Sequence, residues 1–122
     1  MGLDQYLNVY CENFDKQFTY RKVNFLRGWM IRNTSLTEND NCKEVTVPLE
    51  RLKELLKNCN DVLNNHDKAD ELLPSHSGFF FGTYDYDEWY FRGVEQVRDD
   101  LNEIIKIDME YDIEFITYSD WW

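Results

Sequence analysis

The side chains best suited to chemistry lie in residues 72–91, which read LLPSHSGFFFGTYDYDEWYF. The tripeptide Ser75-His76-Ser77 offers a nucleophile and a base, but residues adjacent in sequence rarely form a catalytic triad, because its roles are defined by geometry. The chain has no GxSxG nucleophile elbow. The glycine-bounded phenylalanine run also lacks the Lys-Ser/Thr that completes a phosphate-binding P-loop. We therefore assign no catalytic residue and expect a protein that is not an enzyme.

The histidines and cysteines do not form a recognisable metal site. His66 and His76 lie ten residues apart, without the paired spacing of zinc ligands. Cys11, Cys42 and Cys59 are odd in number and include no CxxC pair, so they also make a poor disulfide framework. The sequence predicts no bound metal and no cofactor. It predicts a buried thiol at Cys59, which falls on the apolar face of a helical pattern.

A binding pocket suits these residue types better than catalysis does. The rings between Phe79 and Phe91 are too apolar for an exposed loop, and the glycines beside them allow sharp turns. If the basic residues near the N-terminus face these rings, the cations can bind phosphate while a base stacks on an aromatic face. The predicted ligand is a nucleotide-like anion. The predicted ligand-binding residues are Arg21, Lys22, Arg27, Ser75, His76, Ser77, Tyr84, Tyr86, Trp89 and Tyr90. The alternative is that the basic residues pair with the acidic C-terminal third across the surface.

Charge is unevenly distributed along the chain, whose formal net charge is −11. Residues 1–33 contain three acids and five bases, whereas residues 84–122 contain twelve acids and three bases. This field repels DNA and RNA, so we expect no direct nucleic-acid binding, and it suits a partner with a basic surface. The acidic residues that would bind such a partner are Glu95, Asp99, Asp100 and Glu103. A solvated acidic face is the simpler explanation of the same residues.

The first half of the chain is expected to contain two strand-like segments and one helix. Residues 3–14 alternate imperfectly between apolar and polar side chains, which favours a strand. Thr19 is the predicted N-cap of a helix over residues 20–33, whose apolar residues recur at three-and-four spacing. Residues 44–47 form a short β-prone segment, which Pro48 ends because proline lacks the N–H of a ladder.

The second half contains the clearest helix, over residues 48–64, where leucines recur at helical spacing. A further turn is expected at residues 68–73. Asp85, three residues before Glu88, resembles a capping box, so we predict that it begins the last helix rather than acting as an acid or base. Residues 113–118 alternate like a strand. At least one of the two terminal tryptophans is expected to pack onto the body of the protein.

Together these elements predict a single α+β domain spanning residues 1–122. The N- and C-terminal strands would form a small antiparallel sheet packed against about three helices, with residues 44–47 or 79–83 as candidates for a further strand. No apolar run approaches the ~20 residues that span a bilayer, and MGLDQYL is not a secretory signal. We therefore expect a cytoplasmic protein without membrane contact. Exposed rings would also allow a homodimer.

Five segments carry a resemblance to known proteins. They are MGLDQYL, YRKVNFLRGWMIRN, VPLERLKELLKNCNDVL, ELLPSHSGFFFGTYDYDEWYF and ITYSDWW. In these segments the chain resembles a family of small uncharacterised proteins encoded by bacteriophages and prophages. It departs from the family pattern where Tyr20-Arg21 lacks an intervening tryptophan and where Lys43 stands in place of a glycine.

The resemblance implies a phage origin and an intracellular setting during infection of a host bacterium. The family has no established activity, so it adds no catalytic residue. We expect an accessory protein that counteracts a host process, immunity above all, by sequestering a nucleotide-like signal. The alternative is an acidic protein that blocks the basic, nucleic-acid-binding site of a host defence protein, as a DNA mimic or an anti-CRISPR protein would.

Overall fold

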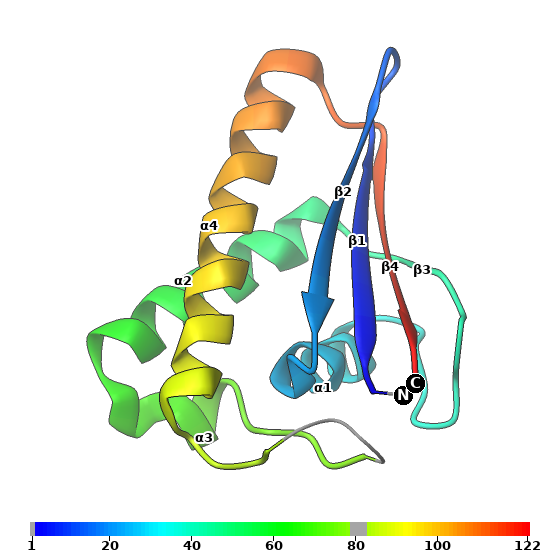
Figure 1. Cartoon of the computed structure of the whole chain (residues 1–122). Coiled ribbons are helices and arrows are strands. Elements are labelled where there is room, and N and C mark those ends of the chain that lie inside the picture. Colours follow the sequence, from blue (N-terminus) through cyan, green and yellow to red (C-terminus); the bar gives the residue numbers. More distant parts are fainter. Residues whose placement is uncertain (1, 79–82) are drawn as a thin grey trace.

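The computed structural model describes residues 2–78 and 83–122, and it confirms an α+β fold. Its strands form one antiparallel sheet in the order β2-β1-β4-β3 (Figure 1). The strands are β1 (Asp4–Tyr10), β2 (Asp15–Arg21), β3 (Val45–Thr46) and β4 (Phe115–Trp121). The strands nearest the two ends of the chain are central neighbours, as the sequence predicted. The short segment at residues 44–47 supplies the edge strand β3.

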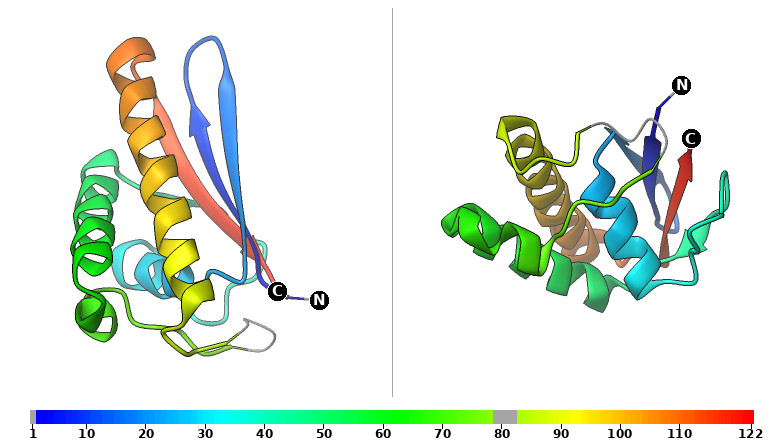
Figure 2. Two further views of the ribbon diagram at one scale, coloured as in Figure 1. Left: turned by 60° about the vertical axis from the view of Figure 1, so that its left-hand side comes forward. Right: turned by 90° about the horizontal axis from the view of Figure 1, so that it is seen from below.

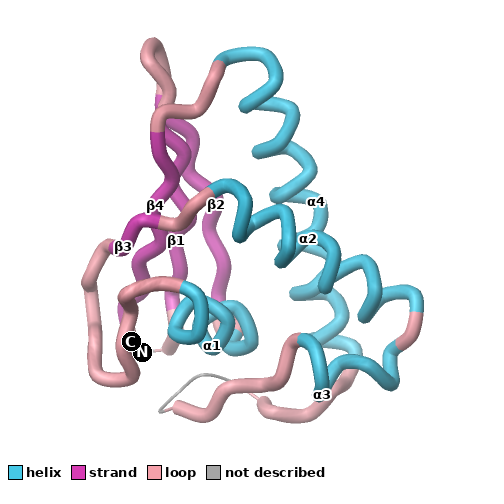
Figure 3. Tube along the Cα trace, turned by 180° about the vertical axis from the view of Figure 1, so that it is seen from behind, coloured by secondary structure: helices cyan, strands magenta, loops and turns pink. Residues whose placement is uncertain are grey.

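The helices lie on one face of this sheet (Figures 2 and 3). They are α1 (Asn24–Asn33), α2 (Leu49–Asn64), α3 (Ala69–Leu72) and α4 (Glu88–Tyr111), with a 3₁₀ turn η1 (His66–Lys68) between α2 and α3. One cluster of buried apolar side chains fills the space between helices and sheet. Cys59 on α2 belongs to this cluster and carries a free thiol, so its predicted burial is confirmed.

The largest error of the sequence prediction concerns residues 15–23. We expected Thr19 to cap a helix that begins at Tyr20, but both residues belong to β2, which pairs with β1. Phe18 and Tyr20 are buried while their neighbours along the strand are exposed, which is the alternation of a sheet with one covered face. Lys22 then adopts a left-handed φ of 58°, which ends the strand and turns the chain into α1.

The start of α4 also differs from the prediction, because Asp87 and not Asp85 is its cap. Asp87 is extended, and its side chain accepts a hydrogen bond from the Tyr90 N–H at 3.1 Å. The Asp85 N–H instead donates to the Thr83 hydroxyl at 3.1 Å, within the turn that precedes the helix. Tyr86 therefore lies before this helix, which begins at Glu88.

The C-terminal end of the chain packs onto the body of the protein. The indole Nε1 of Trp122 donates to the Asp40 carbonyl at 3.0 Å, and its ring lies 5.4 Å from the Arg27 guanidinium carbon. Trp121, by contrast, is 59% exposed. The prediction that at least one terminal tryptophan packs onto the fold is confirmed.

Two further expectations concern the middle of the chain and the membrane. The candidate strand at residues 79–83 stays a prediction, since residues 79–82, with the phenylalanine run and Gly82, lie outside the described residues. Thr83 belongs to no strand. In the part of the chain that the structure describes, no helix combines the length and the apolar character that crossing a bilayer requires.

Candidate functional site

A pocket of about 360 Å³ lies between the turn that joins β2 to α1 and the first turns of α4. It is lined by Arg21, Lys22, Val23, Asn24, Phe25, Thr83, Trp89, Tyr90 and Gly93. Most of its wall is apolar and comes from aromatic and aliphatic side chains, whereas its charge comes from Arg21 and Lys22. Four of the ten residues that the sequence assigned to ligand binding line this pocket: Arg21, Lys22, Trp89 and Tyr90.

Positive charge reaches the pocket from Arg21 and Lys22. Arg21 and Lys22 are exposed, and neither forms an ion pair with any described residue. α1 begins beside them without a side-chain cap and without an acidic residue in its first turn. A helix N-terminus presents amide groups without helical partners and a partial positive charge. A bound anion would therefore meet two cations and the start of a helix.

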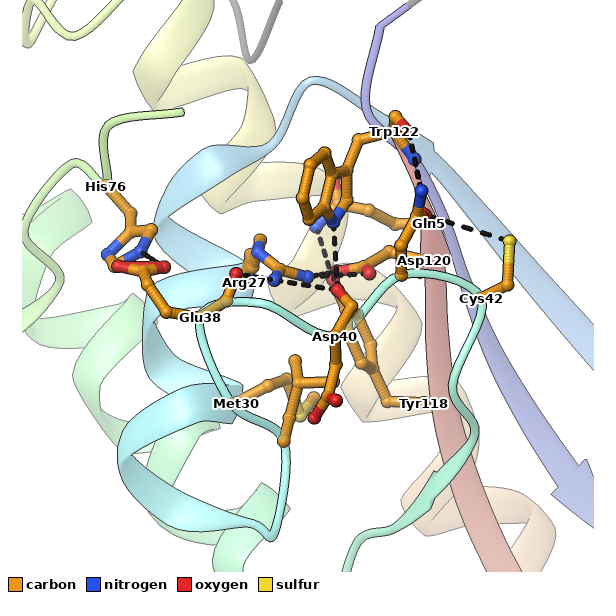
Figure 4. Close-up of polar contacts among 12 residues, drawn as sticks. Gln5, Arg27, Met30, Glu38, Asp40, Cys42, His76, Tyr118, Asp120 and Trp122 are labelled. Carbon is orange, nitrogen blue, oxygen red and sulfur yellow. Dashed lines mark hydrogen bonds and ion pairs between the residues drawn. The ribbon is translucent and has the colours of Figure 1, made fainter. Parts of the chain in front are cut away.

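A buried glutamine fixes the turn that carries these cations. Gln5 has no exposed surface, and its Oε1 accepts from the Val23 N–H while its Nε2 donates to the Val23 carbonyl, each at 2.9 Å. Its Nε2 also donates to the Tyr118 hydroxyl at 3.0 Å. That hydroxyl in turn donates to the Asp120 carboxylate at 2.7 Å (Figure 4). Lys22, in its left-handed conformation, directly precedes the clamped residue. The backbone of the turn that carries the two cations is therefore held in place by the fold.

Arg27 lies outside the pocket, and the prediction that it binds ligand is wrong. Its side chain is fully buried, and its Nη1 donates to both carboxylate oxygens of Asp120, at 2.6 and 2.5 Å (Figure 4). Its Nη2 donates to the carbonyls of Thr37, Glu38 and Asp40 at 3.0–3.2 Å. The alternative, in which the basic residues pair with acids of the C-terminal third, therefore holds for Arg27, although this pair lies in the core and not on the surface.

His76 holds the segment before α4 against α1 and does not line the pocket. Its Nε2 lies 2.8 Å from Glu38 Oε2 (Figure 4), and its backbone N–H donates to the Asn24 side chain at 3.1 Å. Asn24 also donates from Nδ2 to the Thr83 carbonyl at 2.9 Å, so one side chain binds two points of this segment. A Cβ on Gly28 would lie 3.0 Å from the His76 Cβ, closer than side chains normally pack. Glycine at this position therefore permits the close approach.

Ser75, Ser77, Tyr84 and Tyr86 also lie outside the pocket lining. The Tyr86 hydroxyl donates to Asp70 at 2.6 Å and accepts the Ser75 N–H at 3.2 Å. The Tyr84 hydroxyl donates to the Gly78 carbonyl at 2.8 Å. Ser77 is exposed. Six of the ten predicted residues therefore lie apart from Arg21 and Lys22. They are these four residues, His76 and Arg27.

Five pocket residues were missed by sequence reasoning: Val23, Asn24, Phe25, Thr83 and Gly93. Three of them directly follow the left-handed residue at the end of β2, and no local spacing announces that turn. Gly93 did carry a signal, because a glycine in the middle of an apolar helical stripe costs up to ~1 kcal/mol relative to alanine. The sequence therefore showed that Gly93 weakens the helix, but it did not show that this residue lines a pocket.

No protein-family model, curated protein or solved structure matches this chain. The pocket and the charges around it are the features of the described chain that bear on function. Within residues 2–78 and 83–122, no three histidine, cysteine or carboxylate side chains gather into a group that could hold a metal ion. The pocket is the feature whose chemistry can be specified in most detail.

The acidic residues that the sequence assigned to partner binding all lie on α4: Glu95, Asp99, Asp100 and Glu103. Part of their charge is balanced by neighbours. Asp99 accepts from Arg98 Nε at 2.9 Å, and Glu103 lies 3.7 Å from Lys16 Nζ. Because these cations weaken the field of the α4 face, a partner with a basic surface would gain less from it than the sequence suggested.

Asp100 differs from the other three acids because it is half-buried beside the Tyr20 hydroxyl, which is itself buried. Burial raises the pKa of Asp100 above its usual range. The carboxylates of Glu103 and Asp99 also raise it, whereas Tyr20 and Lys16 oppose the shift. The folded protein therefore holds this proton more tightly than the unfolded chain does.

We expect Asp100→Asn to stabilise the protein at pH 7 and to lose that advantage in acid. Because the folded pKa lies above the unfolded pKa, the stability that Asp100 contributes falls as the pH rises from the unfolded value through the folded value. The gain should stay below about 1 kcal/mol, since solvent screens a half-buried group. Melting temperatures of both proteins between pH 3 and pH 7 measure it, with Glu95→Gln as the exposed control. An equal advantage at both ends of that range would contradict the expectation.

Proposed function

We propose that this protein binds a nucleotide-like anion in the pocket between the β2–α1 turn and α4, without catalysing a reaction. The observation that carries the proposal is the combination of two cations without ion pairs, Arg21 and Lys22, with walls formed by Phe25, Trp89 and Tyr90. Guanidinium and ammonium groups favour phosphate oxygens, whereas aromatic rings favour the flat face of a base. A ligand with both parts suits this pocket better than a simple ion or a purely apolar molecule.

The described lining of the pocket supports binding more than turnover. It contains no histidine, cysteine or carboxylate that could act as a base or a nucleophile. The clamp of Gln5 on the Val23 backbone holds the cationic turn in place, so little ordering of the backbone is required when a ligand binds. Such a site favours tight binding of a ligand over its chemical conversion.

The resemblance to phage and prophage proteins supports a biological role for this binding. We infer an accessory protein that acts in the cytoplasm of an infected bacterium and withdraws a nucleotide-like immune signal. Sequestration of this kind depends on tight binding and on the number of copies of the protein, and it requires no chemical step. The same pocket therefore supports this role.

A thermal-shift panel of nucleotides tests the proposal. A ligand that binds only the folded protein stabilises it by about 2.7 kcal/mol at a hundred times its Kd, so melting temperature should rise by several degrees. Arg21→Gln and Lys22→Gln should each reduce this rise, because they remove the charge but keep a long polar side chain.

Matched controls come from α2, where Arg51 and Lys53 are comparably exposed and lie away from the pocket. Arg51→Gln and Lys53→Gln should leave every ligand-induced shift unchanged. A panel in which no nucleotide raises the melting temperature would refute the proposal. The same holds if the α2 substitutions reduce the shift as much as the pocket substitutions do.

A further inference from the structure

The sheet has one face that no described helix covers, and this open face carries aromatic rings. The described helices all lie on the opposite face (Figures 2 and 3). A solvated face of an antiparallel sheet normally presents polar side chains. On β4, however, the open face presents Phe115 and Trp121, which are 46% and 59% exposed. Large rings left in water in this way are typical of a surface that meets a partner.

The strand register places these rings next to carboxylates. Tyr10 is the cross-strand partner of both Asp15 on β2 and Phe115 on β4, so the three side chains form one row across the open face. The rings of Tyr10 and Phe115 stack with their centroids 4.4 Å apart. The Tyr10 hydroxyl donates to the carboxylate of Glu44, just before β3, at 3.3 Å. The ring pair therefore has one carboxylate on its β2 side and another on its β3 side.

The two carboxylates beside the ring pair have no cationic partner among the described residues. Neither Asp15 nor Glu44 forms an ion pair with any of them. The lysines next to them in sequence are paired elsewhere. Lys16 lies 3.7 Å from Glu103 of α4, and Lys43 lies 3.5 Å from an aspartate of its own loop. Exposed rings and carboxylates therefore occur together at this end of the open face.

The sign of this charge limits the kind of partner. Carboxylates repel the phosphates of nucleic acids and of anionic lipids, and a second copy of the chain would bring the same carboxylates against them. A cationic partner is attracted instead. Among cations, a guanidinium can stack on an aromatic ring while its N–H groups donate to a carboxylate beside that ring. A ring pair between two carboxylates therefore suits arginine side chains.

We propose that the open sheet face binds an arginine-rich segment of another protein, with one arginine against Phe115 between Asp15 and Glu44. Trp121 lies on the same face of β4 and extends the contact surface toward the C-terminal end of the strand. This inference does not depend on the nucleotide pocket. It assigns a basic partner to the sheet and not to the acidic residues of α4.

Nuclear magnetic resonance titration of the isotope-labelled full chain tests this, with an extended peptide in which arginine alternates with glycine as the probe. We expect the peptide to shift the amide signals around Tyr10 and Phe115, and to bind more weakly as salt is added. Asp15→Asn/Glu44→Gln should weaken the peptide by about fivefold, because two exposed ion pairs are lost. Phe115→Leu should weaken it by about threefold, because it removes the ring but keeps an apolar side chain.

Glu95→Gln/Asp99→Asn is the matched control, because it removes the same charge from exposed positions on α4. It should leave the affinity for the peptide unchanged. If this control weakens the peptide as much as the sheet variant does, the peptide responds to net charge alone and the inference is wrong. It is also wrong if the peptide shifts no signal of the sheet, or if a lysine–glycine peptide binds as tightly. Shifts of the same signals with protein concentration alone, or with a DNA oligonucleotide, would assign the face to a second copy or to nucleic acid and overturn the proposed partner.

Discussion

Replacing Arg27 with methionine is expected to lower the free energy of unfolding by about 3–5 kcal/mol, because it leaves the Asp120 carboxylate buried without its cation. Neither side chain has any exposed surface. The substitution also removes the donor for the carbonyls of Thr37, Glu38 and Asp40, so the loop after α1 loses its anchor. Domains of this size have total stabilities of roughly 5–15 kcal/mol, so the loss is large.

Urea unfolding followed by circular dichroism measures this loss. Lys16→Ala is the control, because it removes an exposed ion pair with Glu103 and should cost less than about 0.5 kcal/mol. The double variant Arg27→Met/Asp120→Asn should recover part of the stability, since it leaves no buried charge without a partner. If Arg27→Met proved no more harmful than Lys16→Ala, the buried pair would not anchor this part of the fold.

The parts of the fold that could be predicted are those whose pattern is local and long. α2 places Leu52, Leu55 and Cys59 on one face at helical spacing, and all three are buried. β2 could not be recognised, because only Phe18 and Tyr20 of its seven residues are buried. Two buried positions are too few to compete with the helical spacing that begins next to them. The strand exists because β1 pairs with it, and pairing is not visible in either segment alone.

The buried polar network could not be predicted, for a related reason. Gln5 and Tyr118 are 113 residues apart in sequence, and Arg27 and Asp120 are 93 apart. No spacing rule connects such positions. Arg27 did carry a warning, since it lies four residues after Val23 and three before Met30, which is the spacing of one helix face. Its charge drew attention to ligand binding, whereas its place on the helix indicated a partner in the core.

The candidate site was predicted in part, because its composition was visible and its geometry was not. Arg21, Lys22 and Trp89 have the residue types of an anion and ring site, and all three line the pocket. What joins them is the left-handed turn at Lys22, which brings the start of α1 against α4. A backbone angle at one lysine is fixed by tertiary packing, here by the clamp of Gln5 on the next residue. Sequence patterns report side-chain periodicity and carry no record of such a clamp.

Trp89 and Tyr90 are adjacent in sequence, and we expect their replacement by alanine to have opposite consequences. Tyr90 is 8% exposed, packs on Phe25 and donates from its hydroxyl to the Leu73 carbonyl at 2.7 Å. Tyr90→Ala should therefore cost about 3–5 kcal/mol, the usual range for removing a buried ring. Trp89 is 68% exposed, so Trp89→Ala should change stability by less than about 0.5 kcal/mol. It should nevertheless weaken a ring-bearing ligand by about 1–3 kcal/mol, the range for stacking on an aromatic side chain.

Urea unfolding and ligand titration on the same two proteins separate these effects. Tyr90→Phe keeps the ring and removes only the hydroxyl, so it should cost about 1 kcal/mol and show how much of the loss belongs to the bond with Leu73. Titration of Trp89→Ala with inorganic phosphate should match the wild-type protein, because the cations that bind phosphate are untouched. If Trp89→Ala weakened phosphate as much as a nucleotide, the indole would act by shaping the cationic turn and not by stacking. If both alanine variants lost stability equally, Trp89 would belong to the core, and the pocket would have no free ring surface to offer.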